Sequence, residues 1–359
     1  MQIKECLNDI RQAAARIGHD VRLMEVCGTH TMTAFRSGLR SLLPENVSLL
    51  SGPGCPVCVT PQEYIDRIIA IAKLPDTLVT TFGDMLRVPG NEESLEVARA
   101  EGAGVMAVYS PMDALEEAKK NPATRVVFFG VGFETTVPTT AWTIKEAARQ
   151  GVENFSVLCA HKTMPHAMAA LLKGGEINID GFMCPGHVAV ITGTRIFDFL
   201  CDEHGRPCVV AGFEPLDMAL ATAMLLRQIA EGRAEVENEY HRSVDAEGNP
   251  AARALIEEVF APCAAEWRGM GTIEGSGLRI RDEFAQHDAA KIFDKLSLPK
   301  AAGTPGCICG DIIRGARVPT QCALFRKTCT PAKPVGACMV SAEGTCAAYY
   351  KYAGRDQGK

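Results

Sequence analysis

Residues 51–61 read SGPGCPVCVTP and follow a short apolar run at residues 47–50. The apolar run predicts a buried strand, and the Gly-Pro-Gly after it predicts a sharp bend that lets a ligand approach the backbone. Residues 60–63 (TPQE) supply a threonine N-cap, a first-turn proline and a capping-box glutamate, so they predict the start of a helix. The thiols of Cys55 and Cys58 therefore lie just before a predicted helix N-terminus, where unpaired N–H groups favour the thiolate.

The CxxC pattern of Cys55 and Cys58 allows two interpretations. It could be a structural half-site for zinc, but no second CxxC stands at the spacing that zinc modules use. That absence favours redox or metal-transfer chemistry. The spacing does not choose between these two.

The composition of the 359 residues is that of a globular protein, with 47% hydrophobic and 22% charged residues. The length predicts two or three domains. A net charge of -6 argues against nucleic acid as a partner, because phosphate binding depends on Lys and Arg. No apolar run is long enough to span a membrane and the N-terminal stretch is polar, so we expect a cytoplasmic protein without a membrane partner. Fifteen cysteines are many for that compartment and point to metal or thiol chemistry.

Short apolar runs alternate with helical stretches from about residue 21 to residue 211. This alternation predicts an α/β fold in which βαβ units form parallel sheets. Residues 1–18 precede it as an amphipathic helix, and residues 231–249 follow it as a charged helical stretch. The predicted strands are residues 21–26, 47–50, 78–82, 105–109, 126–129, 155–159, 181–184 and 208–211.

Polar and small residues follow each predicted strand, at the edge where open α/β sheets build their sites. Cys27 and His30 follow the first strand, Glu134 the fifth and His187 the seventh, and these are candidate site residues with Cys55 and Cys58. Each histidine has an alternative interpretation as a hydrogen-bonded residue at a strand end. Glu134 could simply be an acid favoured by a helix N-terminus.

Six cysteines lie within 40 residues near the C-terminus, among glycines and prolines typical of a loop-rich module. In a reducing compartment such a module is held together by a metal. Soft thiolates on irregular, widely spaced loops suit an iron–sulfur cluster better than zinc, which remains the alternative. We assign a [4Fe-4S] cluster to Cys309, Cys322, Cys329 and Cys346, with Cys307 and Cys338 as a redox pair beside it. The spacing allows Cys307 in place of Cys309 equally well.

These patterns together predict two parallel-sheet βαβ lobes that face a cleft, plus a loop-rich C-terminal iron–sulfur module with helices from both termini. The division between the lobes is placed at Asn121-Pro122, because eight strands are too many for one small sheet. The expected domains are an N-terminal helix at 1–20 that packs with the C-terminal domain, a lobe at 21–122 that carries the three cleft cysteines, a second lobe at 123–230, and a helical, loop-rich [4Fe-4S] domain at 231–359.

Several long motifs in one order resemble the [NiFe]-hydrogenase maturation family HypD. The resemblance runs from about residue 20 to the C-terminus. The motifs are CGTH at 27–30, GPGCPVC at 52–58, TFGD at 81–84, GFETT at 132–136, PGHV at 185–188, GFEP at 212–215 and CMVSAEGTC at 338–346.

The resemblance implies a scaffold on which iron carrying two cyanides and one carbon monoxide is assembled for the hydrogenase large subunit. It implies a small chaperone, HypC, and a cyanide donor, HypE, as partners. Cys27 would bind this iron together with a chaperone cysteine, and Cys55 and Cys58 would be the thiols of the assembly site. His187 and Glu134 would line the same cleft. The C-terminal cysteines resemble those of ferredoxin-thioredoxin reductases, which implies electron delivery to Cys55 and Cys58.

Two alternatives come from other classes of function. A general thiol–disulfide oxidoreductase would use the cluster to reduce Cys55 and Cys58 for diverse protein substrates. A structural metal-bound interaction protein would tolerate Cys55→Ser without loss of hydrogenase maturation. The sequence by itself does not decide whether the chain is an enzyme or an assembly factor with thiol redox chemistry.

Overall fold

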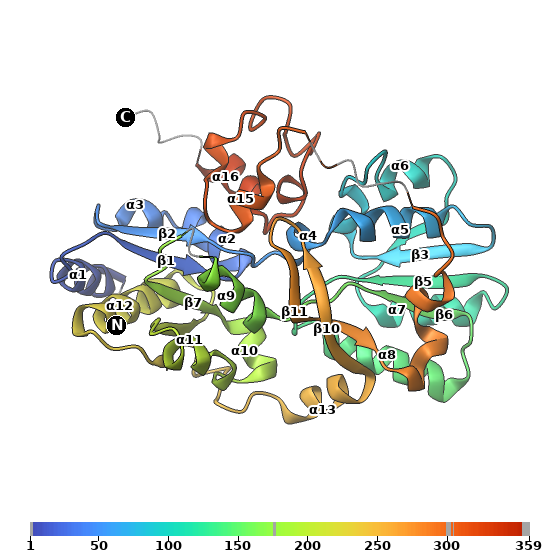
Figure 1. Ribbon diagram of the computed structural model, residues 1–359, viewed down its shortest axis with the longest axis horizontal. Coiled ribbons are helices and arrows are strands. Elements are labelled where there is room, and N and C mark those ends of the chain that lie inside the picture. Colours follow the sequence, from blue (N-terminus) through green and yellow to red (C-terminus); the bar gives the residue numbers. More distant parts are fainter. Residues whose placement is uncertain (1–2, 175–176, 299–302, 304, 354–359) are drawn as a thin grey trace.

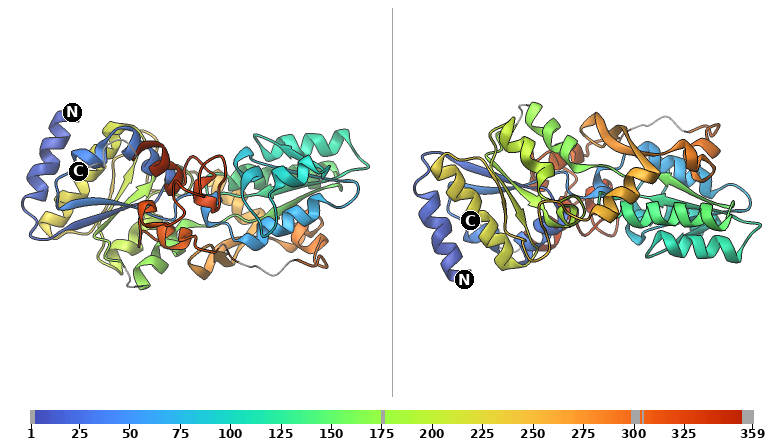
Figure 2. Two further views of the ribbon diagram at one scale, coloured as in Figure 1. Left: turned by 90° about the horizontal axis from the view of Figure 1, so that it is seen from above. Right: turned by 90° about the horizontal axis from the view of Figure 1, so that it is seen from below.

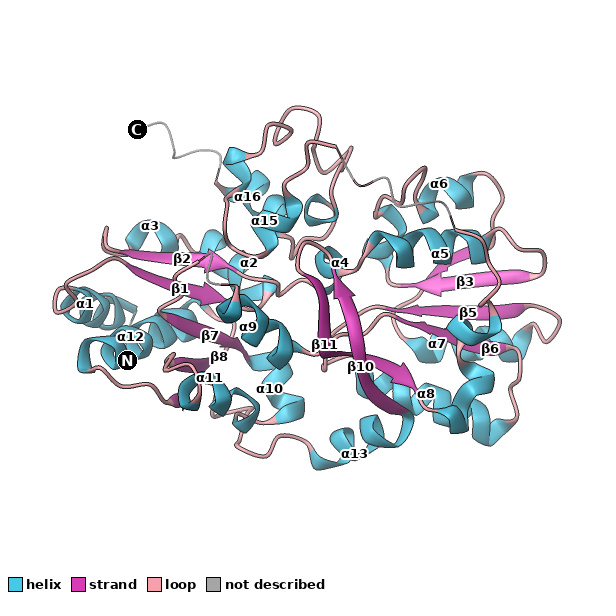
Figure 3. Cartoon of the chain, in the orientation of Figure 1, coloured by secondary structure: helices cyan, strands magenta, loops and turns pink. Residues whose placement is uncertain are grey.

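The fold is α/β, as the alternation of strands and helices predicts. A computed structural model describes residues 3–174, 177–298, 303 and 305–353. It contains two parallel sheets, a long antiparallel hairpin and a loop-rich segment near the C-terminus (Figures 1 and 3).

The first lobe is built on a five-stranded sheet in which all neighbouring strands are parallel. Its strands are short and mostly buried on both faces, which is why they appear in the sequence as continuous apolar runs. Their order across the sheet is β2 (Val47–Ser51), β1 (Val21–Glu25), β7 (Gly181–Pro185), β8 (Cys208–Ala211) and β9 (Val236–Asn238).

The second lobe is built on a four-stranded parallel sheet. Figure 2 shows helices on both sides of this sheet. The strand order is β4 (Val105–Ala107), β3 (Thr77–Thr81), β5 (Arg125–Gly130) and β6 (Phe155–Cys159).

The predicted division of the lobes at Asn121-Pro122 is wrong. Strand β3 before this point pairs with β5 after it, and β1 pairs with β7, which lies far beyond it in the sequence. The chain instead leaves the first lobe after β2 and returns to it at β7. Alternation of strands and helices reveals the elements but not their partners, and Asn121-Pro122 is only the turn between α7 (Pro111–Lys120) and β5.

Helices cover the faces of both sheets. In the first lobe these are α2 (Gly28–Arg36), α3 (Leu39–Leu42), α10 (Gly186–Thr192), α11 (Asp198–Asp202) and α12 (Pro215–Glu231). In the second lobe they are α5 (Gln62–Ala72), α6 (Leu95–Ala100), α7, α8 (Val137–Gln150) and α14 (Ala289–Ile292). No helix among the described residues combines the length and the apolar character that crossing a bilayer requires.

The N-terminal helix α1 (Ile3–Ala14) packs against α12, so its predicted packing with the C-terminal domain is wrong. Cys6 and Ile10 on its apolar stripe are fully buried in the core of the first lobe. The predicted helical stretch at 231–249 is wrong too. Helix α12 ends at Glu231, and the following residues form β9, which pairs with β8, and turns.

The remaining elements lie across and above the two lobes (Figure 1). Helix α13 (Pro250–Val259) leads into the hairpin of β10 (Phe260–Trp267) and β11 (Gly271–Ile280), and β11 packs against α9 (Met164–Lys173). Residues 305–353, here called the C-terminal module, are mostly loops. Their short helices are α15 (Cys309–Ile313), η4 (Pro319–Gln321), η5 (Ala337–Met339) and α16 (Thr345–Tyr352).

Ile10→Ala should lower the free energy of unfolding by about 2–5 kcal/mol, because it removes a fully buried side chain from the contact of α1 with α12. The control is Ile3→Ala in the same helix, where the side chain is 41% exposed and the expected loss is under about 1 kcal/mol. Chemical denaturation followed by circular dichroism measures both. Equal losses in the two variants would contradict the packing of α1 described above.

Candidate functional site: the cleft and the cysteine cavity

A cavity of about 620 Å³ lies where the carboxyl ends of the strands of both lobes meet. The first lobe contributes Cys27 after β1 and His187 after β7, and the second lobe contributes Asp84 after β3 and Phe133 after β5. The C-terminal module closes one side with Glu343. Residues that follow strands of both sheets thus line one cavity, and of the predicted site residues Cys27 and His187 are among them.

Cys27 lies in this cleft because the loop after β1 touches the loop after β2. Cys27 is the N-cap of α2, in an extended conformation. A Cβ atom on Gly54 would stand 2.4 Å from Cys27 Cα, and the N–H of Gly28 donates to the carbonyl oxygen of Gly54 at 3.2 Å. Only glycine allows the two backbones this close.

The surroundings of Cys27 favour the neutral thiol. Burial, and secondarily the negative charge of Glu343, raises the pKa of Cys27 to about 11. Glu343 accepts a hydrogen bond of 2.9 Å from Thr29 Oγ1, across a separation of 314 residues in the sequence. Burial also raises the pKa of Glu343 itself. A metal bound to Cys27 would therefore have to displace its proton.

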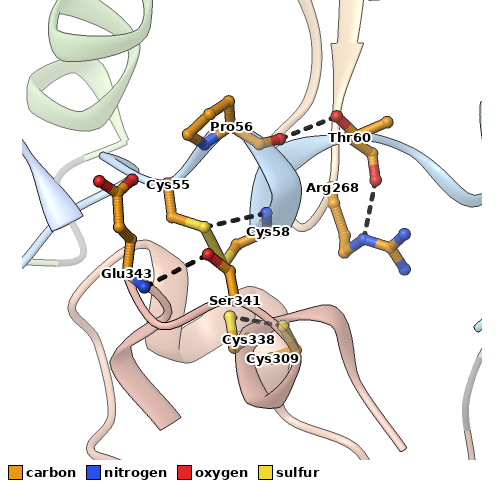
Figure 4. Close-up of a disulfide and its surroundings, with 9 residues drawn as sticks. All are labelled: Cys55, Pro56, Cys58, Thr60, Arg268, Cys309, Cys338, Ser341 and Glu343. Atoms are coloured by element: carbon orange, nitrogen blue, oxygen red, sulfur yellow. Dashed lines mark hydrogen bonds between the residues drawn. A yellow bond between two sulfur atoms is a disulfide. The ribbon is translucent and has the colours of Figure 1, made fainter. Parts of the chain in front are cut away.

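Cys55 and Cys58 do not line the cavity, although their neighbours Gly54, Pro56 and Val57 do. They form a disulfide on a separate helical turn, α4 (Pro56–Val59), and both are buried. Helix α4 packs against η5, so the disulfide faces the C-terminal module (Figure 4). Of the three predicted cleft thiols, only Cys27 is thus free and within the cleft wall.

A helix starts at residues 60–63 as predicted, but its N-cap is Pro61 rather than Thr60. Helix α5 begins at Gln62 with Pro61 as its N-cap, and Glu63 lies in its first turn. Thr60 does not cap it, because its hydroxyl donates to the carbonyl oxygen of Pro56 at 2.8 Å and so closes α4.

The two candidate histidines lie on opposite sides of one phenyl ring. His187 stacks on Phe213 at 3.7 Å between ring centroids and lines the cleft, while His30 stacks on the same ring at 4.8 Å and does not reach the cleft. His30 is fully buried, and its Nε2 donates to the carbonyl oxygens of Ala211 at 3.2 Å and Gly212 at 3.0 Å. Burial lowers the pKa of His30 to about 4, so it is a neutral support for Phe213 and His187.

Glu134 lies behind the cleft wall, whereas its neighbours Phe133 and Thr135 line it. Its Oε1 accepts a hydrogen bond of 2.8 Å from the N–H of Met164, and its buried Oε2 has no hydrogen-bond partner in the described part of the chain. Burial raises the pKa of Glu134 to about 7, which makes it able to hold or release a proton near neutral pH.

Sequence reasoning left two cleft acids without a role. Glu343 stands in the quoted motif at 338–346, and its position inside that motif was the available signal. Asp84 in the TFGD motif is exposed in the cleft wall. Neither motif shows that the two acids line the same cavity as Cys27.

All six C-terminal cysteines line one small cavity, here called the cysteine cavity. The sulfur atoms of Cys309 and Cys338 are 2.9 Å apart, and side-chain contacts with Cys307 and Cys338 hold the pKa of Cys309 well below its usual value. The other lining side chains are apolar: Ile312, Leu324, Phe325 and Met339.

The donors of the cysteine cavity fit an iron–sulfur cluster. Such a cluster takes one thiolate for each iron rather than several thiolates for one ion. In the described ranges, no three Cys, His, Asp or Glu side chains are arranged around a single metal ion. The N–H of Val335 donates to Cys329 Sγ at 3.4 Å, and a Cβ on Gly336 would stand 2.8 Å from Cys307 Sγ, so the backbone comes close to the sulfurs.

Alkylation of Cys27 by iodoacetamide should be slow at about pH 8 and rise about tenfold per pH unit up to about pH 11, because only the thiolate reacts. Glu343→Gln removes a neighbouring negative charge, which lowers the pKa of Cys27 and should speed the reaction at the same pH. Mass spectrometry of the peptide that contains Cys27 measures the rate. A rate at pH 8 equal to that of an ordinary free thiol would contradict the predicted burial effect.

Comparison with known proteins agrees with the motifs. The family model HypD, described as the hydrogenase formation hypA family, matches residues 1–353. The chain is 47% identical over 359 residues to the hydrogenase maturation factor HypD of Rhodobacter capsulatus, covering 98% of this chain and 95% of that protein. It is 48% identical over 355 residues to the hydrogenase expression/formation protein HupD of Azotobacter chroococcum, covering 95% and 93%. It is 44% identical over 356 residues to HypD of Escherichia coli K12, covering 98% and 95%. The chain therefore belongs to the HypD family of hydrogenase maturation factors.

Proposed function

We propose that this chain is the scaffold on which the Fe(CN)2CO group of [NiFe] hydrogenase is assembled, with the cleft as the assembly site. The observation that carries the proposal is the position of Cys27, a free thiol in the wall of a large cavity where two lobes and the C-terminal module meet. A thiolate is a ligand that stabilises iron carrying strong-field diatomics. The family of hydrogenase maturation factors supports the same role.

Each cleft residue has its own proposed role around the iron. Cys27 binds the iron and loses its proton, for which the nearby carboxylate of Glu343 provides an acceptor with a raised pKa. His187 faces the cavity from the Phe213 stack and offers a neutral imidazole, because burial lowers its pKa. Apolar side chains such as Val57 and Phe133 limit the access of water to the bound ligands.

The partners are proposed to be the small chaperone HypC and the cyanide donor HypE, with the hydrogenase large subunit as the eventual recipient, all in the cytoplasm. The cleft wall supports docking of a protein. Tyr109 lies in that wall and is 100% exposed, and Met112 three residues later is 43% exposed. Apolar side chains that stay exposed beside a site are typical of protein contact surfaces.

The cysteine cavity is proposed to hold a [4Fe-4S] cluster that supplies electrons to the Cys55–Cys58 disulfide. The packing of α4 on η5 supports this route, because η5 carries Cys338 next to the disulfide (Figure 4). The contact of Cys309 with Cys338 favours these two as the redox pair, which leaves Cys307, Cys322, Cys329 and Cys346 as cluster ligands. This is the exchange of Cys307 for Cys309 that the spacing allowed.

A general thiol–disulfide oxidoreductase is the weaker proposal. Cys55 is 5% exposed and Cys58 is 2% exposed. A disulfide this deeply buried cannot undergo thiol–disulfide exchange with the thiols of unrelated folded proteins. Its redox partner must therefore come from within the chain or from a specific complex.

The complex of this chain with its chaperone should show nitrile and carbonyl infrared bands after anaerobic purification, and Cys27→Ala should remove them because the iron loses its cleft ligand. Cys263→Ala is the control, since Cys263 lies on β10 outside the cleft wall. Bands that persist unchanged in Cys27→Ala would refute the assigned role of Cys27.

Replacing a cluster ligand should lower the iron and sulfide content of the anaerobically purified chain. We expect this loss in Cys307→Ser and Cys322→Ser, whereas Cys309→Ser should keep the cluster. Visible absorption and iron analysis measure the difference. A cluster kept in Cys307→Ser and lost in Cys309→Ser would show that Cys309, and not Cys307, is a cluster ligand.

A further inference from the structure

The tip of the β10–β11 hairpin, residues 268–270, lies between α4 and the C-terminal module (Figures 1 and 4). Gly269 has a φ of +77°, and a Cβ on it would stand 2.2 Å from Gly310 Cα. Arg314 Nη1 donates to the carbonyl oxygen of Gly269 at 2.6 Å. The hairpin tip therefore touches the residue directly after Cys309.

Arg268 on this tip holds the end of α4. Its backbone N–H donates to the carbonyl oxygen of Val59 at 2.9 Å, and its Nε donates to that of Thr60 at 2.9 Å (Figure 4). These carbonyls end the helical turn that carries the Cys55–Cys58 disulfide. A cation at a helix C-terminus is favourable, so Arg268 fixes α4 where it meets the module.

The guanidinium of Arg268 has an unused donor. Its Nη2 is buried without a hydrogen-bond partner, and no carboxylate in the described ranges forms an ion pair with it. Burial raises the pKa of Asp66, and the positive charge of Arg268 partly offsets this rise. The carboxylate of Asp66 already accepts hydrogen bonds from the backbone N–H and Nδ2 of Asn91, both at 2.7 Å. A buried cation with an unpaired N–H is costly unless an anion forms near it.

We propose that Arg268 is a positioning residue that ties α4 to the cysteine cavity and supplies the positive charge that favours reduction there. The inference rests on the proposed [4Fe-4S] site. One electron added to that site makes its charge one unit more negative, with no bond broken and Arg268 still protonated. Arg268 directly precedes Gly269, whose backbone touches Gly310 beside Cys309 at the edge of the cavity, so its positive charge stabilises the more negative reduced state.

The test is a redox titration of the anaerobically purified full chain with dithionite, followed by the electron paramagnetic resonance of the reduced cluster. Arg268→Gln should lower the equilibrium constant for one-electron reduction of the cluster about tenfold, which lowers its midpoint potential by about 59 mV. Arg268→Lys keeps the charge and should keep the potential. The matched control is Arg314→Gln, which changes the same hairpin contact but removes a charge that Asp311 neutralises at 2.8 Å.

An unchanged potential in Arg268→Gln, or an equal shift in Arg314→Gln, would overturn the inference and leave the proposed function intact. If Arg268→Gln does not fold, a tenfold change in the equilibrium constant for reduction of the cluster in Arg268→Lys would overturn the inference instead. A wild-type chain without any cluster signal would count against the proposed cofactor.

Without a cluster, the effect of Arg268 is measured on Cys309 and Cys338 in dithiothreitol redox buffers. Two electrons from the dithiol reduce their disulfide to two thiols, and alkylation with mass spectrometry counts them. Arg268→Gln should then shift the equilibrium about tenfold toward the disulfide. An equilibrium equal to that of the wild type would overturn the inference in this form.

Discussion

The backbone contact between Gly54 and Cys27 is the constraint on which the rest of the site depends. It joins the loops after β2 and β1, two neighbouring parallel strands, so closely that a single Cβ would separate them. Because of this contact, Cys27 lies in the cleft while the chain just after Gly54 turns away into α4. The same few residues thereby present one thiol to the cavity and a disulfide to the C-terminal module.

The chain path explains how one polypeptide forms a cleft with walls from two sheets. The segment between β2 and β7 supplies all four strands of the second sheet as an insertion into the first lobe, and α14 is added from later in the chain. The carboxyl ends of both sheets meet at the cleft. The C-terminal module then completes the wall with Glu343 and supports α4 through η5. Each wall of the site therefore belongs to a different part of the sequence.

The sequence predicts elements well and their partners poorly. Strands β6 and β8 match their apolar runs because buried parallel strands are short and continuously hydrophobic. The pairing of β3 with β5 depends on contacts that no local pattern encodes. For the same reason His30 and His187 look equivalent in the sequence, although only His187 reaches the cavity. The closeness of Cys309 to Cys338 likewise arises from loops that lack any periodic pattern.

The hydrogen bond between Thr29 and Glu343 joins an early loop to one of the last segments of the chain. During synthesis on the ribosome, the loop of Cys27 emerges long before Glu343 exists. A nascent chain therefore lacks one wall beside Cys27 until residue 343 has been synthesised. A ligand that needs this enclosed cavity can therefore be held only after the segment of Glu343 has folded onto the loop of Cys27, so the order of synthesis delays binding.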